Sequence, residues 1–161
     1  MRYRIEFGQS DANRIKAQKF RQRVFRESET GLDEDKFDKI SDHCLIFDEK
    51  KDGKLVLVFR SRSFSSMKDI LCSYSAQYYD LTKLTSLPFK PMEIGRLCID
   101  KTAKDPFLLL TAFKYLASLI SSGQRDFIFG CTSFSGANNP RHLASLSLSL
   151  IHIWRCRRTF R

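Results

Sequence analysis

Residues 92–99 read MEIGRLCI, residues 105–122 read DPFLLLTAFKYLASLISS, and residues 127–131 read FIFGC. The first and last stretches are short, apolar and bounded by turn-forming residues, which predicts two strands. The middle stretch opens with aspartate and then proline, a helix-start signal, because proline at the first helical position loses no hydrogen bond. This helix is apolar almost all round. We therefore expect it to be buried or to line an apolar cavity, and we expect the last strand to be central.

The residues before this unit predict further strands and one more helix. Tyr3, Ile5 and Phe7 alternate with charged residues, which indicates a strand with one buried face. Asp52-Gly53 is a hairpin turn signal. In chain order we expect a strand over 3–7, a helix over 12–27 capped by Ser10 or Asp11, an ordered loop or short helical turn over 30–42, strands over 44–47 and 55–59, and a long connection over 61–91.

The composition fits one globular domain with a basic surface. The chain has 161 residues, a hydrophobic fraction of 42% and a formal net charge of +10. A basic surface attracts acidic partners such as acyl carrier proteins, nucleic acids and anionic membranes. The net charge alone does not show which of these three binds. Cys44, Cys72, Cys98 and Cys131 have no CxxC spacing, so we expect reduced thiols, a cytoplasmic location and no metal site. The polar N-terminus is not a signal peptide, and no apolar stretch is long enough to span a bilayer.

Four segments follow one another along the chain: KFRQRVFRE at 19–27, DKFDKISDH at 35–43, EIGR at 93–96 and FIFGCTSF at 127–134. They resemble the ornithine N-alpha-acyltransferases of ornithine-lipid synthesis, a branch of the GNAT superfamily close to the acyl-homoserine-lactone synthases. The resemblance runs from Tyr3 to Leu143. It implies a GNAT-like α/β fold, in which a mixed central sheet is flanked by helices. The fourth and fifth strands of that fold splay, and the donor's pantetheine arm uses the strand amides that the splay exposes.

The resemblance also implies a reaction and its partners. The expected reaction transfers a 3-hydroxyacyl group from acyl carrier protein to the alpha-amine of ornithine. It needs no cofactor besides the phosphopantetheine thioester of the donor, and acyl-CoA is an alternative donor. The expected location is the bacterial cytoplasm, with peripheral contact at the inner membrane as a further expectation. No nucleic-acid partner is expected.

Glu93 and Arg96 are the candidate catalytic residues. Period-two alternation would place Glu93 and Gly95 on one face of the strand, with Ile94 and Arg96 on the other. A glutamate beside a glycine can deprotonate an incoming ammonium where substrate comes close; the alternative is a surface carboxylate paired with a lysine. Arg96 matches the arginine of the E-x-x-R pattern of the resembled families. It either organises the active site or forms an ion pair with the neighbouring acidic loop.

Other charged residues are candidates for binding substrate. The acidic loop carries Asp35, Asp38 and Asp42, which could hold a cationic amino acid or simply cap local turns. Arg21 and Arg23 match the first-helix motif of the resembled family and could contact the donor's phosphate or the carrier protein; the alternative is a solvated basic face. His43 is expected to be a hydrogen-bonded histidine at the start of a strand.

The loop after the fourth strand bears on the acyl donor. Acetyl-CoA-dependent GNAT enzymes have a glycine-rich loop there, whose amides hold the pyrophosphate at a helix N-terminus. Here residues 100–106 read DKTAKDP without glycine, which favours a carrier protein whose single phosphodiester meets Lys101 or Lys104. Phe113 and Phe129 could line a tunnel for the acyl chain or be ordinary core residues.

Other interpretations stay open from the sequence. They are a generic GNAT N-acetyltransferase, an acyl-homoserine-lactone synthase, whose N-terminal tryptophan is missing here, a basic binding module and an inactive truncated fragment.

Asn138-Asn139-Pro140 predicts the start of another helix. Residues 148–158 read LSLIHIWRCRR and resemble a translated sequencing adapter. We therefore expect an incomplete acyltransferase domain over 1–145 and a non-native tail over 146–161.

Overall fold

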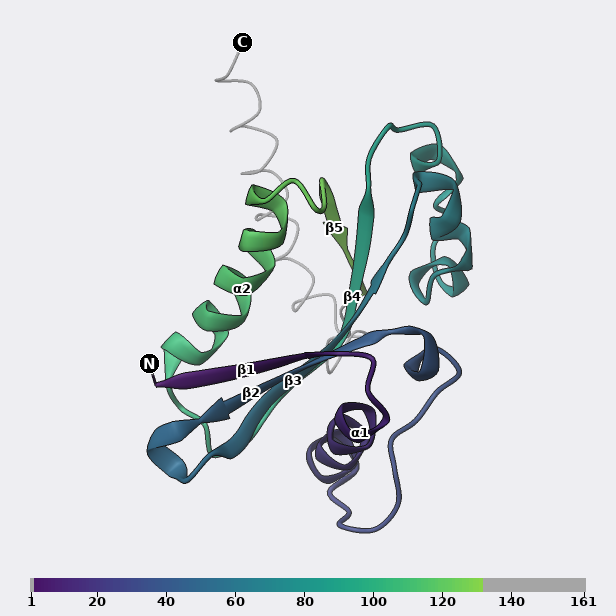
Figure 1. The fold of residues 1–161 in the computed structure, drawn as a ribbon. Coiled ribbons are helices and arrows are strands. Elements are labelled where there is room, and N and C mark those ends of the chain that lie inside the picture. Colours follow the sequence, from purple (N-terminus) through teal and green to yellow (C-terminus); the bar gives the residue numbers. More distant parts are fainter. Residues whose placement is uncertain (1, 132–161) are drawn as a thin grey trace, which may run out of the picture. The chain divides into compact units, whose positions relative to one another are not determined.

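The computed structural model describes residues 2–131, which form one mixed sheet with helices on both faces (Figure 1). Its strands lie across the sheet in chain order: β1 (Tyr3–Gly8), β2 (Asp42–Asp48), β3 (Lys54–Ser63), β4 (Pro91–Ile99) and β5 (Phe127–Phe129). Neighbours are antiparallel except β4 and β5, which run parallel. A parallel pair needs a crossover, and α2 (Pro106–Ser121) supplies it. The predicted order of strands and helices is confirmed.

Both helices start where the sequence indicates. Ser10 caps α1 (Asp11–Arg26), since its side chain accepts a hydrogen bond from the Asn13 amide. Asp105 caps α2 by accepting from the Phe107 amide at 2.9 Å, with Pro106 at the first helical position. Gly123 follows α2 with a φ of 70°, a left-handed conformation that suits glycine. Local side-chain chemistry therefore sets these helix boundaries.

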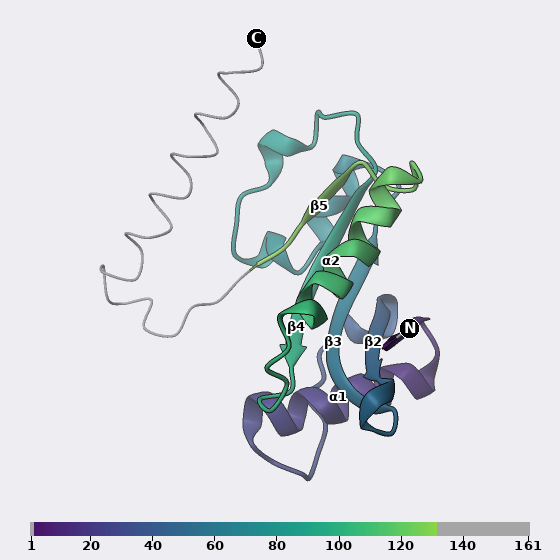
Figure 2. The same ribbon diagram turned by 90° about the vertical axis from the view of Figure 1, so that its left-hand side faces the viewer.

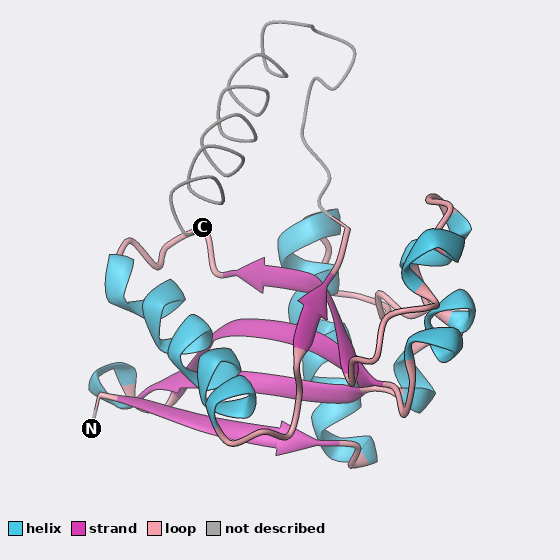
Figure 3. Cartoon of the chain, turned by 90° about the horizontal axis from the view of Figure 1, so that it is seen from above, coloured by secondary structure: helices cyan, strands magenta, loops and turns pink. Residues whose placement is uncertain are grey.

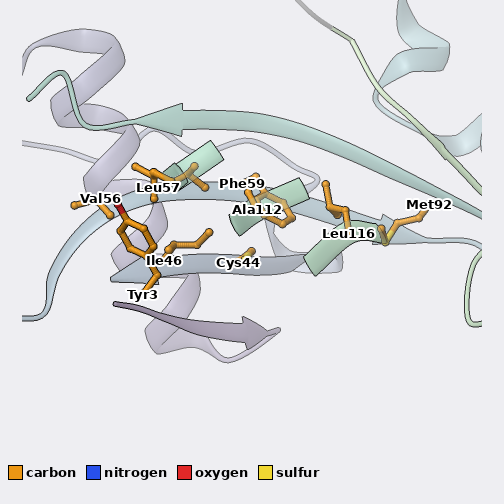
Figure 4. Packing of buried hydrophobic residues seen from close by; sticks show 10 residues of the cluster. Tyr3, Cys44, Ile46, Val56, Leu57, Phe59, Met92, Ala112 and Leu116 are labelled. Atoms are coloured by element: carbon orange, nitrogen blue, oxygen red, sulfur yellow. The ribbon is translucent and has the colours of Figure 1, made fainter. Parts of the chain in front are cut away.

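The alternation of side chains along the strands divides the core between the two faces of the sheet. Figures 2 and 3 show α2 packed along one face. The core on this face joins residues of β1, β2, β3 and β4 to residues of α2: Tyr3, Cys44, Ile46, Val56, Leu57, Phe59, Met92, Leu108, Ala112 and Leu116. Figure 4 labels all of them except Leu108. The opposite face packs against α1 through Ala17, Phe20, Leu45, Phe47, Val58 and Cys98.

The long connection between β3 and β4 is ordered by its own small core. It consists of three short 3₁₀ turns, η3 (Met67–Cys72), η4 (Ser75–Gln77) and η5 (Thr82–Leu84). The core of this connection is Phe64, Met67 and Ile70, against which Phe127 and Phe129 of β5 pack. Since Ile128 packs on the α2 side, this connection covers the other face of the sheet.

Three expectations change or stay open. β5 is the last strand of the sheet within residues 2–131 and is only half-buried, so the prediction of a central strand is wrong for the described sheet. α2 is not buried all round, because Phe107 and Phe113 are 65% and 51% exposed. The helix predicted from Asn138 and the tail over 146–161 lie outside the described residues, so the domain division stays a prediction.

A search of the described helices for a membrane span finds none of sufficient length and apolarity.

Candidate functional site

A β-bulge brings Glu93 and Arg96 to the same face of β4. Arg60 of β3 pairs with Gly95 and Val58 pairs with Cys98, so three steps along β4 match two along β3. The bulge lies at Arg96, which has a φ of 54°, in the left-handed region that few non-glycine residues adopt. The expected alternation, with Arg96 on the face opposite Glu93, is therefore wrong. Bulges commonly re-aim a side chain in this way.

Glu93 is a buried carboxylate held by the connection between β3 and β4. It is 6% exposed and accepts hydrogen bonds from the Tyr74 amide at 3.0 Å, the Ser75 amide at 2.7 Å and the Ser75 hydroxyl at 2.6 Å. The alternative of a surface carboxylate paired with lysine is wrong. A carboxylate offers about four lone-pair positions. The Ser75 bonds go to Oε1 and the Tyr74 bond to Oε2, so one acceptor position stays open on Oε2.

Beside Glu93 lies a cluster of six charged residues, called here the charge cluster: Arg21, Arg60, Arg96, Asp33, Asp35 and Asp38. Arg60 binds Asp35 at 2.5 Å and Asp38 at 2.8 Å, while Arg96 binds Asp35 at 3.0 Å. Arg21 binds Asp33 at 2.9 Å and Asp38 at 2.7 Å. Three guanidinium groups thus balance three carboxylates, which allows this many charges to be buried together.

Within the charge cluster, Asp35 and Asp38 differ in what they offer to a substrate. Asp38 is 1% exposed; its Oδ2 accepts hydrogen bonds from Gln18, Arg21 and the Asp35 amide, and its Oδ1 accepts one from Arg60, so burial and these partners close it to a substrate. Asp35 is more exposed and accepts from Arg60, Arg96 and the Phe37 amide. Of the two carboxylates, Asp35 is the one that combines an open acceptor position with a side chain exposed to solvent, at 19% against 1% for Asp38.

Burial and charge act against each other on Asp38. Burial alone would raise the pKa of its carboxyl, but Arg21, the Gln18 amide and Arg60 stabilise the ionised form and lower the pKa to about 2.

Asp42 does not join the charge cluster. It begins β2, where burial raises its pKa. His43 is fully buried, and its Nε2 is hydrogen-bonded to the Asp38 carbonyl oxygen at 3.0 Å, as expected for a histidine at a strand start. Burial lowers the pKa of His43.

The Tyr74 ring connects Glu93 with the charge cluster. Its amide donates to Glu93, while its ring faces two guanidinium groups, Arg60 at 5.7 Å and Arg96 at 5.8 Å from the ring centre. Phe37 meets the same ring edge-on at 5.7 Å. Such cation–π and edge-to-face contacts fix the position of a ring. The orientation of the Glu93 carboxylate therefore depends on the charge cluster through Tyr74.

The basic candidates of the first helix separate in the structure. Arg21 is 1% exposed inside the charge cluster, so its expected place on a basic outer face is wrong. Arg23 remains partly exposed, 3.8 Å from Asp100. Lys101 is exposed and paired with Glu27, and Lys104 is exposed in the same loop. Of these four residues, only Arg21 lies in the charge cluster beside Glu93.

The two candidate acyl-chain residues do not lie together. Phe113 points away from the core on the outer side of α2. Phe129 packs on the opposite face of the sheet, against Phe64 at 6.2 Å between ring centres. The expected apolar tunnel between these two residues is therefore not formed in the described part of the chain.

The end of β4 and the start of α2 each carry a carboxylate that is paired with basic side chains. Asp100 is buried, binds Lys54 at 3.0 Å and accepts from the Thr102 amide and hydroxyl. The Asp105 carboxylate covers the N-terminus of α2 and also binds Tyr3 and Arg2. The Asp105 carboxylate therefore occupies the amides at the helix start, the position that would otherwise be open to an anion. Within residues 2–131, β5 pairs only with residues 91–93 of β4, so residues 94–99 have no partner on β5.

Several site residues were not predicted from the sequence. Arg60 carried a usable signal, because it lies two residues after Val58 on the same strand, and period-two alternation places both side chains on one face. Tyr74 and Ser75 lie in a connection without periodicity, where no signal was available. Among residues 2–131 no group of three or more His, Cys, Asp or Glu side chains could hold a metal ion.

Comparisons with known proteins agree on a fold and a family. A family model described as an acetyltransferase (GNAT) domain matches residues 16–112. An L-ornithine N(alpha)-acyltransferase of Brucella abortus is 27% identical over 165 residues, covering 99% of this chain and 54% of the relative. Another of that name, from Rhodobacter capsulatus, is 27% identical over 143 residues, covering 80% and 55%. This chain thus spans about half the length of these relatives.

A solved structure supports the fold. An aminoglycoside acetyltransferase from an uncultured soil metagenomic sample superposes with a TM-score of 0.56, covering 89% of this chain and 88% of that one. Its sequence identity is 10%, so this likeness concerns the fold.

Proposed function

Because the chain belongs to the acetyltransferase (GNAT) family, we propose that it is an N-acyltransferase that moves a 3-hydroxyacyl group from acyl carrier protein to the alpha-amine of ornithine. The observation that carries this proposal is the bulge in β4, which puts Glu93 and Arg96 on one face, beside the half of that strand that has no β5 partner within residues 2–131. The two ornithine acyltransferase relatives support the choice of acceptor.

Glu93 has the position of a general base. The open acceptor position on Oε2 takes a proton from the alpha-ammonium group, and the neutral amine then attacks the carbonyl carbon of the thioester. Tyr74 and Ser75 hold the carboxylate in place with three hydrogen bonds, so little reorganisation is needed during the reaction. Arg96 binds Asp35 and holds it in place. The open acceptor position of Asp35 would bind the side-chain ammonium of ornithine.

The capping carboxylate at the start of α2 supports a carrier protein as donor. A pyrophosphate bound at the N-terminus of α2 would meet the Asp105 carboxylate, which already occupies the Phe107 amide there. A phosphopantetheine attached to a protein has only one phosphodiester. Arg23, Lys101 and Lys104 are exposed at this end of the molecule and could meet it or the acidic carrier surface.

The test of the reaction is an acyl-transfer assay with the purified protein, 3-hydroxyacyl carrier protein and ornithine. We expect Glu93→Gln to lower kcat by about 10²–10⁴-fold, the range for a lost general base. Glu29→Gln is the control, because Glu29 is exposed and far from these contacts. Circular dichroism would verify that the variants fold. Product from acetyl-CoA alone, or no product with any amine, would reject the proposed donor and acceptor.

Asp35 gives a second test, which concerns the choice of amine. We expect Asp35→Asn to raise KM for ornithine while 2-aminopentanoate, which lacks the side-chain ammonium, is affected much less. The reason is that a neutral amide removes the charge that attracts the second ammonium group. KM and kcat would be measured for both amines. An equal effect on both would show that Asp35 does not select the acceptor.

A further inference from the structure

The outer side of α1 carries a row of exposed basic side chains, called here the basic row: Lys16, Lys19, Arg23 and Arg26. Side chains three or four residues apart are neighbours on a helix surface, so these four lie along one side of α1. The other side packs on the sheet through Ala17 and Phe20. No acidic residue occurs between positions 12 and 26, so the helix has no carboxylate of its own to neutralise the row.

The basic row keeps its charges available to a partner. Three members lie 3.8 Å from a carboxylate, a distance too long for a hydrogen bond: Lys16 from Glu6, Arg23 from Asp100 and Arg26 from Asp33. Their side chains are 52%, 42% and 66% exposed. Lys19 is exposed and has no ion pair within residues 2–131. The N–H donors of the row are thus open to an external acidic surface.

The basic row runs beside the end of β4 (Figure 2). α1 packs on Cys98 of that strand, and Arg23 lies next to Asp100, which directly follows the strand. Lys101 of the same loop is paired with Glu27, which directly follows α1. Residues 94–99 of β4 have no β5 partner within residues 2–131, and the donor's arm would bind there. A protein that delivers such an arm therefore has the basic row within its contact area.

The side chains around the basic row favour a protein over other acidic partners. A helix that lies on a membrane turns its apolar side outward, whereas the apolar side of α1 faces the sheet. The exposed apolar residues Ile15 and Phe25 are ten residues apart, about 15 Å along the helix axis, and form no common patch. Surfaces for single-stranded nucleic acid place several aromatic rings among the cations, and α1 exposes only Phe25.

We propose that the basic row of α1 is the docking surface for the acyl carrier protein that delivers the thioester. This inference rests on the proposed function and identifies the surface that binds its donor. Opposite charges on the carrier and on the row accelerate association and fix the orientation in which the arm enters beside β4. Because exposed charges are screened by salt, the docking weakens as ionic strength rises.

The test compares two donors with the same 3-hydroxyacyl group, one on carrier protein and one on free pantetheine. At low salt, Lys16→Glu/Lys19→Glu should raise KM for the carrier-bound donor by about tenfold or more. The same variant should leave kcat/KM for the pantetheine thioester unchanged. Lys68→Glu/Lys83→Glu is the matched control, since it makes the same change of charge at exposed residues of the connection between β3 and β4. Circular dichroism would verify that both variants fold.

A titration with holo carrier protein needs no reaction, so it separates this inference from the proposed function. Equal carrier Kd and KM for the unchanged protein and Lys16→Glu/Lys19→Glu would overturn the inference and leave the proposed reaction standing. If that variant instead lost affinity for phosphatidylglycerol vesicles or DNA, the row would serve a lipid or nucleic acid. About tenfold weaker carrier binding by the variant, with no product from any amine, would keep the docking surface and reject the proposed reaction.

Discussion

At the scale of single residues, the charge cluster shows how a strongly basic helix can contribute to a core. Arg21 lies on the same helix as Arg23 and Arg26, yet it is 1% exposed while Arg26 is largely exposed. Its guanidinium group has five donors in a fixed fork, and two carboxylates accept from it. Removing one member of a buried ion pair leaves the other charge uncompensated, which destabilises far more than the pair itself stabilises.

Arg21→Met is therefore expected to lower the free energy of unfolding by about 3–5 kcal/mol, because Asp33 and Asp38 stay buried without it. Arg26→Met is the matched control on the same helix, since its guanidinium is 3.8 Å from Asp33 and exposed, and it should change stability by about 0.5 kcal/mol or less. Urea denaturation at neutral pH measures both. Equal losses would mean that the buried ion pairs do not hold the acidic loop.

At the scale of elements, the two halves of the bulged strand β4 have different roles. Its first half pairs with β5 and supplies Glu93, and its second half pairs with β3 alone among the described residues. Two glycines near this strand differ in their surroundings. Gly130 touches the β4 backbone at Ile94, whereas Gly95 has nothing within 4 Å of an added Cβ and no left-handed φ. The first glycine is thus required by packing, while the second leaves open space beside Glu93.

Gly130→Ala should destabilise the protein by about 1–3 kcal/mol, since the added methyl group must push β5 from β4. Gly95→Ala should leave the urea midpoint almost unchanged but raise KM if substrate approaches the strand at that place. Thermal or urea unfolding and steady-state kinetics of both variants test this pair. Loss of stability in Gly95→Ala, or none in Gly130→Ala, would contradict the geometry.

At the scale of the whole molecule, buried titratable groups make stability depend on pH. The folded-state pKa of Asp38 is lowered to about 2, so its contribution is complete above the unfolded value of 3.8 and is lost as pH falls toward 2. The difference corresponds to about 2 kcal/mol. His43 acts in the same direction at higher pH, because burial lowers its pKa and protonation then favours the unfolded chain.

We accordingly expect the free energy of unfolding to begin to fall as pH drops below about 6.5, the ordinary pKa of histidine, and to fall further below about 4. Urea midpoints measured from pH 7 to pH 3 would show the two limbs. Asp38→Asn should be less stable at neutral pH and should have a weaker acid limb. A stability that stays constant down to pH 4 would show that His43 is not buried in its neutral form.

The sequence by itself determined the order of elements, the ends of both helices and the family. Caps, turns and hydrophobic periodicity act over a few residues, so Asp105-Pro106 and Asp52-Gly53 specify local structure wherever they occur. It also singled out Glu93 and Arg96. It did not predict that both side chains share a face, because a bulge arises from the pairing of β3 with β4.

Only the tertiary structure decided which charged residues are buried and which residues complete the site. Arg21 and Arg23 look alike in the sequence, and their environments differ because the acidic loop folds over only one side of α1. Tyr74 and Ser75 reach Glu93 from 19 and 18 residues away in sequence, and Cys131 reaches Ser75 from 56 residues away. Such contacts depend on how distant segments pack, and local patterns carry no information about them.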